Sequence, residues 1–269
     1  MIRDKIKEIK RTKTAKNKFS TPKLGNSNNG IYLLLDHIWG MSMINILTQI
    51  KLVMLPEDQY FREVTPKTMI FIHHTAGNSN PLSVVEDWAR SEERIATSFV
   101  IGGTPPKGIT AWTDGMPVQC FSSNYWAYHL GIKATKMPPG SIAPMQIQKQ
   151  SIGIEICNWG WVTKRPDGKF INYVGGIMSP EEIIDLGHDY RGYRYWHAYT
   201  DAQIETVRLL LLYLCEKWNI TSTFKGMEMF DLDERAFKGE SGIWTHTTVR
   251  KDKWDCSPQP KLIDMLKSL

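Results

Sequence analysis

The sequence of 269 residues has little cysteine, no internal repeat and no signature of a serine nucleophile. Its four cysteines occur without a CxxC pair, which argues against a disulfide framework and favours a reducing compartment. The lack of repeats excludes a repeat architecture such as a solenoid. No GxSxG segment is present, so nothing in the chain supports a serine hydrolase with a nucleophile elbow.

Long hydrophobic runs are also missing. Residues 31–55 are apolar on balance, but Asp36, His37 and Lys51 interrupt them, and the longest uncharged part is shorter than the ~20 residues of a spanning helix. We therefore expect no transmembrane segment. We also expect no signal peptide, because the preceding basic region is too long and no small-residue cleavage site stands out. A helix packed on the main domain and an interfacial helix both remain open for this segment.

Positive charge is concentrated at the start of the chain. Residues 1–23 hold nine Lys or Arg and two acidic residues, so they carry +7 and the remainder carries −2 of the total +5. Such an arm could be attracted to an anionic wall polymer, a membrane surface or nucleic acid, or simply be solvated. We expect no nucleic-acid partner. We divide the chain into a basic arm with an amphipathic extension, residues 1–55, and a catalytic domain, residues 56–269.

Hydrophobic periodicity predicts an α/β domain. Apolar runs and alternating patterns predict strands at residues 69–74, 98–102, 117–121 and 151–157. Helices are predicted at residues 81–94 and 201–219, the second from a stripe of apolar residues at helical spacing. The length of the chain fits one substantial α/β domain plus an extension.

A strand that ends in two histidines is the first candidate for chemistry. Residues 70–77 read IFIHHTAG, which places His73 and His74 at the end of the strand. Neighbouring residues of a strand point to opposite faces, so only one of the two can face a given site. Neutral imidazole is a common zinc ligand, although a structural role is equally compatible with this segment taken alone.

The second candidate lies in the last loop of the chain. His246 is followed by Asp255 nine residues later and by Cys256 ten residues later, and either could complete a zinc site. Pro258 and Pro260 stiffen the chain after this point. Loop polar residues beside a half-buried cysteine are the structural alternative for this pattern.

A carboxylate within an apolar strand is the third candidate. Residues 151–157 read SIGIEIC, and alternation places Glu155 on the face opposite Ile152, Ile154 and Ile156. A carboxylate in this position suits a base that takes a proton from a metal-bound water and returns it to a leaving amine. A Glu of an edge strand that faces solvent is the alternative.

Four segments in a fixed order resemble a known enzyme family. They are HHTAG at 73–77, WAYHLG at 126–131, SIGIE at 151–155 and H-x6-KxD with a following Pro at 246–258. Their order is similar to that in zinc-dependent N-acetylmuramoyl-L-alanine amidases of the phage-lysozyme type, which are related to peptidoglycan recognition proteins. The resemblance spans residues 56–269, is closest to endolysins of phage and prophage origin, and implies a central mixed β-sheet flanked by helices.

The resemblance also implies which residues bind zinc. His73, His246 and Asp255 correspond to the ligands, and Cys256 is the alternative third ligand because relatives use either residue type shortly after a lysine. Asp255 is favoured because it stands two residues after Lys253, which reproduces the spacing from lysine to ligand. Lys253 corresponds to the lysine that stabilises the developing oxyanion.

Further roles follow from the same resemblance. Glu155 takes the position of the catalytic acid, and Thr97 stands where some relatives have a catalytic tyrosine. The segment at 126–131 resembles the one that lines the substrate groove, where an aromatic platform suits a sugar and a peptide, although loop packing is the alternative. The side chains predicted to bind substrate are His74, Trp126, Tyr128 and His129.

The implied activity is hydrolysis of the amide between N-acetylmuramic acid and L-alanine in peptidoglycan by zinc-activated water. A non-catalytic peptidoglycan-binding module is the alternative, because some relatives lack a metal ligand. A serine or thiol hydrolase built on Cys157 or Cys256 is a third possibility. We expect synthesis in the cytoplasm of a bacterial host and action at its wall as a phage or prophage lysis enzyme. The oligomeric state and the choice between polymer and soluble fragment stay open.

Overall fold

The computed structural model describes residues 46–269, so the predicted basic arm and most of the predicted amphipathic segment lie outside the described residues. The chain divides into two compact units, Met1–Gln49 and Ile50–Leu269. The first strand of the second unit, β1 (Lys51–Leu52), pairs with β4 (Pro117–Gln119), and the domain boundary at residue 56 stays a prediction. Within residues 46–269 no helix is long and apolar enough to cross a membrane.

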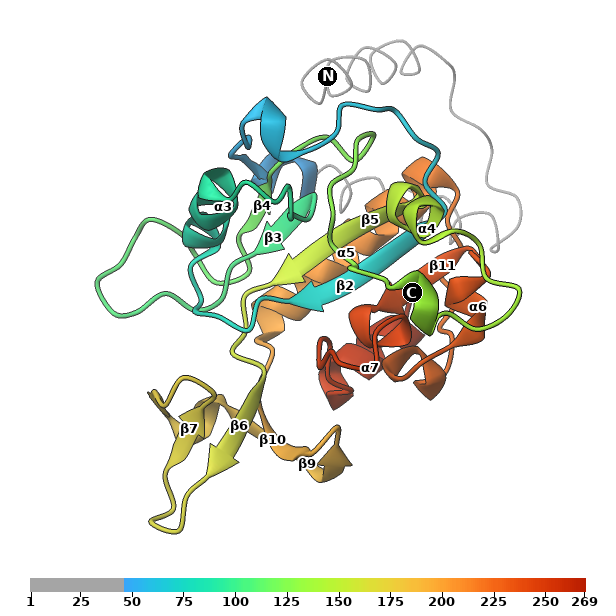
Figure 1. Cartoon of the computed structure of the whole chain (residues 1–269). Coiled ribbons are helices and arrows are strands. Elements are labelled where there is room, and N and C mark those ends of the chain that lie inside the picture. Colours follow the sequence, from blue (N-terminus) through green and yellow to red (C-terminus); the bar gives the residue numbers. More distant parts are fainter. Residues whose placement is uncertain (1–45) are drawn as a thin grey trace, which may run out of the picture. The chain divides into compact units, whose positions relative to one another are not determined.

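A six-stranded mixed sheet forms the centre of the second unit (Figure 1). Its strand order is β1-β4-β3-β5-β2-β11, and only β3 and β4 run antiparallel to each other. The remaining strands are β2 (Met69–His74), β3 (Phe99–Ile101), β5 (Ser151–Ile156) and β11 (Gly242–Thr245). β2 is buried along its whole length, as expected for a central parallel strand with a continuous apolar sequence. The predicted α/β fold with a central mixed sheet is confirmed.

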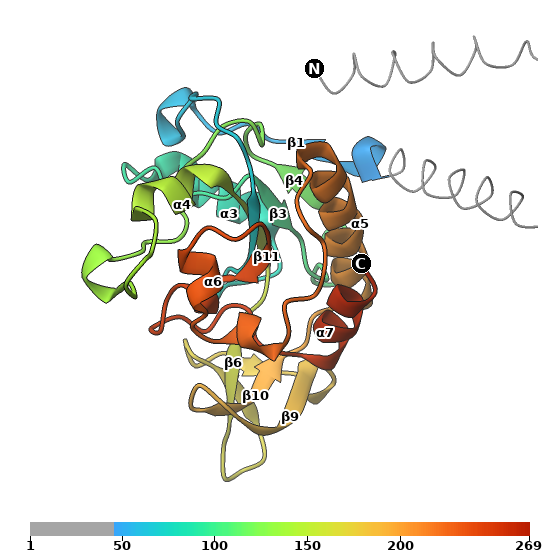
Figure 2. The same ribbon diagram turned by 90° about the vertical axis from the view of Figure 1, so that its right-hand side faces the viewer.

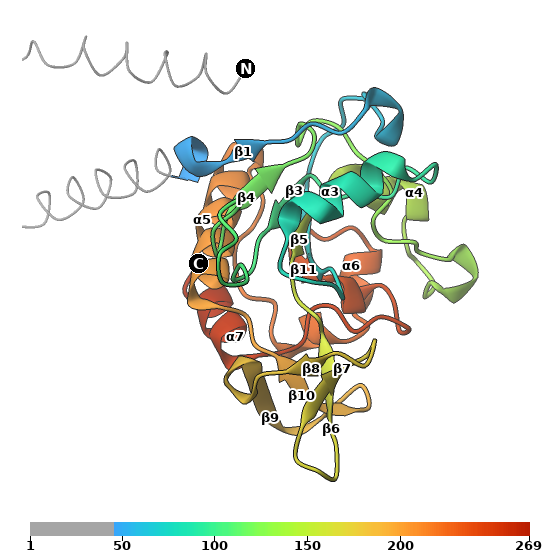
Figure 3. The same ribbon diagram turned by 90° about the vertical axis from the view of Figure 1, so that its left-hand side faces the viewer.

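Helices lie on opposite sides of this sheet (Figures 2 and 3). On one side, α5 (Asp201–Trp218) packs against α7 (Pro260–Lys267) and buries its apolar stripe in the core that includes the β5 isoleucines. On the other side, α3 (Pro81–Arg90) contributes Val85 to a cluster with Val100 and Cys157. Two short helices, α4 (Pro144–Gln150) and α6 (Glu234–Phe237), complete the set of α-helices in the second unit.

The ends of the two long helices follow from local sequence. Thr200 and Gln203 form a reciprocal capping box at the start of α5, and Asn219 ends it in the left-handed conformation. The Asn80 side chain caps α3 by accepting a hydrogen bond from the Leu82 backbone. α3 ends at Arg90, before the predicted end at residue 94, and Arg94 has a φ of 53°, which a right-handed helix excludes.

A second, antiparallel sheet is inserted between β5 and α5 (Figure 1). Its strand order is β8-β7-β6-β10-β9, and our sequence analysis did not predict it. Its strands are β6 (Trp161–Lys164), β7 (Phe170–Asn172), β8 (Ile177–Met178), β9 (Ile183–Tyr190) and β10 (Tyr193–His197). The insertion starts at Gly160, where a Cβ would lie 2.9 Å from Nε2 of His74, so the inserted sheet adjoins the carboxyl end of β2.

Candidate active site

The candidate site lies at the carboxyl ends of three neighbouring parallel strands. In the register of β2 and β5, His73 is paired with Glu155, so their side chains share one face of the sheet. β11 lies on the other side of β2 and ends at Thr245, directly before His246. Because the carboxyl ends of parallel strands meet at one edge, residues far apart in the sequence converge here.

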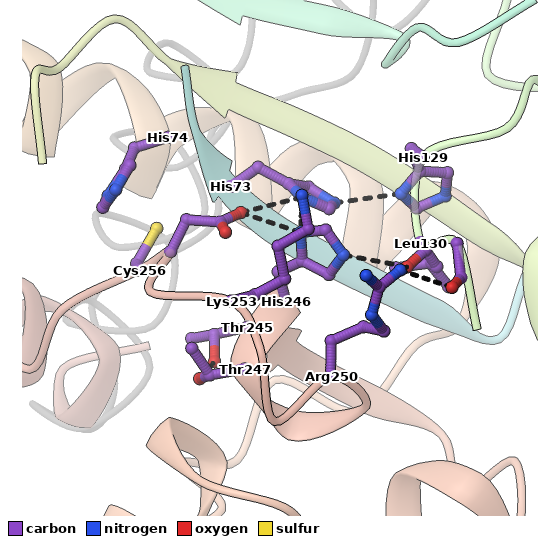
Figure 4. A network of polar contacts seen from close by, with 12 residues as sticks. His73, His74, His129, Leu130, Thr245, His246, Thr247, Arg250, Lys253 and Cys256 are labelled. Atoms are coloured by element: carbon purple, nitrogen blue, oxygen red, sulfur yellow. Dashed lines mark hydrogen bonds and ion pairs between the residues drawn. The ribbon is translucent and has the colours of Figure 1, made fainter. Parts of the chain in front are cut away.

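Two imidazoles and a carboxylate form the centre of the site (Figure 4). Nδ1 of His73 lies 3.1 Å from Nδ1 of His246 and 3.2 Å from Oδ2 of Asp255, and Nδ1 of His246 lies 2.9 Å from the same oxygen. All three side chains are buried. They are the one group among residues 46–269 whose donor atoms are placed to hold a metal ion together.

The hydrogen bonds of His246 fix which of its nitrogens carries a proton. Its Nε2 lies 2.9 Å from the carbonyl oxygen of Leu130, which can only accept. Nε2 therefore carries the hydrogen, and in the neutral ring Nδ1 is left with a lone pair that points at Asp255 and His73. A backbone carbonyl that orients the outer nitrogen of a histidine in this way is typical of metal ligands.

A longer chain of hydrogen bonds fixes His73 in the same way. The Ser151 hydroxyl donates to the carbonyl of Gln148, so it accepts from Nε2 of His129 at 2.9 Å. Nδ1 of His129 is then an acceptor, 3.0 Å from Nε2 of His73, which must donate. In the neutral ring, Nδ1 of His73 therefore also carries a lone pair. Burial and the nearby His246 lower the pKa of His73 to about 4, so the ring is neutral at neutral pH.

Nδ1 of His73, Nδ1 of His246 and Oδ2 of Asp255 thus face one another as three potential ligand atoms. Burial alone would raise the pKa of Asp255, but the adjacent imidazoles of His246 and His73 hold it well below the usual range, so the carboxylate is ionised. Such an arrangement suits a cation. Two ligands of a tetrahedral zinc ion lie about 3.3 Å apart when each is about 2.0–2.1 Å from the metal, close to the observed separations. The donor set and its geometry therefore fit zinc.

Cys256, the alternative third ligand, lies outside this group. It is buried, and its sulfur lies on the side of His74 in Figure 4. Burial raises the pKa of its thiol although Tyr199 hydrogen-bonds to it. The structure therefore brings Asp255, and not Cys256, to the two imidazoles, while metal binding by Asp255 stays a prediction.

Glu155 and Lys253, the two predicted catalytic residues, flank the cluster. Burial, followed by the negative charge of Asp255, raises the pKa of Glu155 well above its usual value, and Lys253 partly offsets this. Among residues 46–269 no group hydrogen-bonds the Glu155 carboxyl, so it is available to a ligand. The Lys253 side chain extends from the last loop toward His73 (Figure 4). Their placement fits the predicted roles, which stay predictions.

Two of the predicted substrate-binding residues lie at unexpected places. His74 follows His73 in β2 and points to the opposite face, where its Nδ1 lies 3.0 Å from the Tyr199 hydroxyl. His129 lies behind His73, where its Nδ1 accepts a hydrogen bond from Nε2 of His73, and thus supports a predicted ligand. Substrate contact by His74 and His129 stays a prediction.

Trp126 and Tyr128 belong to an aromatic group with Phe61. Trp126 stacks on Phe61 at a centroid distance of 3.9 Å, donates its indole N–H to Glu63 and is only 5% exposed. Tyr128 packs edge-on against both rings. Their predicted contact with substrate is untested. Thr97, which stands at the expected position of a tyrosine, is buried, and its hydroxyl donates to the Phe99 carbonyl.

One residue that the sequence analysis missed joins the inserted sheet to the last loop. Arg191, between β9 and β10, donates from Nη1 to the carbonyls of Lys251 at 2.6 Å and Lys253 at 2.9 Å, and from Nη2 to Asp231 at 2.7 Å. Periodicity could not reveal this contact, because two of its acceptors are backbone carbonyls about 60 positions away. Gly192, next to Arg191, was the only local signal of a tight turn.

Comparison with known proteins adds a family to this geometry. Residues 63–260 match the N-acetylmuramoyl-L-alanine amidase family, and no curated protein matches the chain. One similar solved structure is that of PlyL, at 13% identity, covering 81% of this chain and 96% of that chain with a TM-score of 0.42. Another is N-acetylmuramoyl-L-alanine amidase LysC from Clostridium intestinale, at 15% identity, 81% and 95% coverage and a TM-score of 0.42.

A mutant endolysin from Bacillus subtilis is similar at 14% identity, with 81% of this chain and 96% of that chain covered and a TM-score of 0.44. The match to the family extends over most of the sequence, from before β2 to the start of α7. It contains all the residues that meet at the candidate site. The chain therefore belongs to the N-acetylmuramoyl-L-alanine amidase family.

Proposed function

We propose that this amidase hydrolyses the bond between N-acetylmuramic acid and L-alanine in peptidoglycan with a zinc ion held by His73, His246 and Asp255. The observation that carries the proposal is the convergence of three potential ligand atoms, 2.9–3.2 Å apart, from β2, from the end of β11 and from the last loop. Zinc, when bound, supplies a Lewis acid that makes water acidic near neutral pH and polarises the scissile carbonyl.

Glu155 is proposed to move the proton during the reaction. Burial raises its pKa, which makes the carboxylate a stronger base toward the proton of the attacking water. As the water oxygen bonds to the carbonyl carbon, its proton passes to the Glu155 carboxylate. When the carbon–nitrogen bond breaks, the same proton passes to the nitrogen of L-alanine, which leaves as an amine.

Lys253 is proposed to stabilise the oxyanion. The negative charge that develops on the carbonyl oxygen needs a fixed donor within reach, and the ammonium group extends toward the cluster. Two carbonyls of its loop are bonded to Arg191, which limits how far the backbone at Lys253 can move.

The two alternative functions have less support. A binding module without catalysis needs no base. Glu155, however, lies on the same face of the sheet as His73 and has no hydrogen-bond partner among the described residues, 46–269. A thiol hydrolase needs a thiol with a lowered pKa, whereas burial raises the pKa of both Cys157 and Cys256. Action at the wall of a bacterial host follows from the proposed substrate, and the phage or prophage origin stays a prediction.

Digestion of purified peptidoglycan tests the proposal. We expect the full chain to release free peptide stems with an N-terminal L-alanine and to leave the sugar strands uncut, as identified by mass spectrometry. A chelator should abolish the release and added zinc should restore it. Release of cut sugar strands, or full activity of metal-free protein, would refute the proposal.

A further inference from the structure

The inserted sheet has two faces of different character. In the antiparallel pairing of β6 with β10, Trp161 lies opposite Trp196, and Val162 lies opposite Tyr195. Directly opposed residues share a face, so the Trp161 side and the Tyr195 side are different faces of the sheet. Trp196 is fully buried and lies beside His74 of β2, so the face that carries Trp161 is the one that meets the six-stranded sheet.

A register shift brings a further ring onto the Trp161 face. Strict alternation would place Tyr193 with Tyr195, but the pairing of β10 with β9 is irregular between these two residues. Such irregularities re-aim side chains. Tyr193 instead stacks on Trp161, with centroids 4.0 Å apart and ring planes at 11°.

Two more rings extend this stack. Tyr173 lies 5.9 Å from Trp161 and 6.2 Å from Trp159, measured between ring centroids. We call Trp159, Trp161, Tyr173 and Tyr193 the aromatic face. Tyr173 is 45% exposed and the other three are half-buried, so the rings form part of the molecular surface and are not sealed in a core.

The surroundings of the aromatic face are apolar or uncharged. Register places Thr163, Ile171 and Ile177 on the same side of the sheet, and Ile177 is 68% exposed. Lys164, by contrast, lies over the rings of Phe170 and Tyr195 on the opposite side. Among the strand residues of the insertion placed by this register, none on the aromatic side offers a cation to an acidic peptide.

The aromatic face is held at a fixed position beside the catalytic residues. The Tyr173 hydroxyl donates to the carbonyl of Ala76, two residues after the end of β2. Arg191 bonds the loop that carries Lys253, and the indole of Trp254, which is 38% exposed, donates to the Arg191 carbonyl. These contacts, on two different catalytic segments, make the surface continuous with the candidate site.

We propose that the aromatic face is a subsite for the sugar strand of peptidoglycan, beyond the N-acetylmuramic acid unit whose amide is cleaved. A hexosamine ring has an apolar face of C–H groups, which packs on an aromatic ring, and polar edges that stay hydrated. A row of half-exposed rings with no cation suits this neutral polymer better than it suits the acidic peptide stem. The proposal rests on the amidase function proposed above and specifies its substrate as a polymer.

Comparison of a long and a short substrate tests the subsite. We expect Trp161→Ala to raise KM for polymeric peptidoglycan about three- to tenfold, since aromatic contacts of this kind are worth up to about a factor of ten. Hydrolysis of N-acetylmuramoyl tripeptide, which has one sugar, should not change. Tyr195→Ala is the matched control, because it removes a half-buried ring from the opposite face of the same sheet. It should leave both substrates unaffected.

A binding measurement separates the subsite from catalysis. Glycan strands stripped of their peptides should bind the wild type and Tyr195→Ala equally, and Trp161→Ala more weakly, in isothermal titration calorimetry. If Trp161→Ala does not fold, Tyr173→Ala removes an exposed ring of the same surface and should give the same result. Equal losses with polymer and tripeptide, or equal binding of stripped strands by all variants, would overturn the subsite. A wild type that binds strands but cleaves neither substrate would refute the amidase proposal alone.

Discussion

In the six-stranded sheet the histidine rings of the candidate site point inward, and each is fixed by a hydrogen bond at its outer nitrogen. In the five-stranded sheet the aromatic rings lie on a half-exposed face and are held by contacts between rings. His73 and His246 each have one nitrogen directed at the cluster and the other committed to a hydrogen bond. Trp161 and Tyr193 contact each other face to face and remain partly open to solvent.

The difference follows from the two kinds of sheet. Parallel strands are covered on both faces, so a polar residue at their carboxyl ends must be satisfied by specific partners, which also position it for chemistry. An antiparallel sheet tolerates one wet face and can present side chains to a large ligand. We therefore expect changes in the central sheet to affect turnover and changes in the inserted sheet to affect substrate affinity.

The largest effect is expected from Glu155→Gln. The amide keeps the shape of the side chain but cannot exchange a proton, so kcat should fall about 10²- to 10⁴-fold. Zinc content and thermal stability should match the wild type. Stopped assays of peptide release with matched metal analysis provide the measurement. Wild-type turnover by this variant would remove Glu155 from the mechanism.

Lys253→Met should come next, because it removes the cation assigned to the oxyanion. A loss of about 10²- to 10³-fold in kcat is expected, with KM little changed. Lys251→Met is the matched control, because this exposed lysine belongs to the same loop and uses its backbone carbonyl to bind Arg191. A similar loss in both variants would show that the charge of the loop, and not the position of Lys253, sets the rate.

Arg191→Gln tests the connection between the two sheets. It removes the charged donor to the carbonyls of Lys251 and Lys253, so we expect a loss of about 1.5–3 kcal/mol in unfolding free energy. Displacement of Lys253 should lower kcat about 10- to 100-fold on long and short substrates alike. Denaturant unfolding and steady-state kinetics measure the two effects. A change confined to KM for the polymer would place Arg191 functionally with the aromatic face.

The smallest effect concerns a buried lysine just before β2. Lys67 donates to the carbonyls of Lys149 and Ser151, and burial lowers its pKa to about 7. Between pH 7 and the higher pKa of the unfolded chain, the unfolded state binds more protons, so stability should rise with pH. The slope contributed by Lys67 is at most about 1.4 kcal/mol per pH unit. Urea unfolding of Lys67→Met should lack this contribution, and identical slopes would contradict it.

Sequence patterns located the central elements well but not the inserted sheet. Residues 69–74 form a strand as predicted, because a continuous apolar run ending in polar residues leaves little choice at the centre of a parallel sheet. The stripe of apolar residues at helical spacing predicted α5 equally well. The strands of the insertion mix aromatic, charged and glycine residues, so neither the two-residue period of a strand nor the 3.6-residue period of a helix dominates. β11, four residues long, was also too short to predict.

The candidate site could be predicted in part for a similar reason. His73 and Glu155 stand at strand positions where alternation fixes the face. Asp255 and Cys256 are neighbours in a loop, where no period determines direction, so only coordinates could choose between them. The role of His129 as a hydrogen-bond partner of His73 depends on a contact between residues 56 positions apart, which no local pattern encodes.

Metal analysis of three purified proteins tests the central claim most directly. The account predicts one zinc ion per chain in the wild type and in Cys256→Ser, a strongly reduced content in Asp255→Ala, and peptide release that follows the zinc content. Full zinc occupancy in Asp255→Ala together with loss of zinc in Cys256→Ser would contradict the site built from His73, His246 and Asp255.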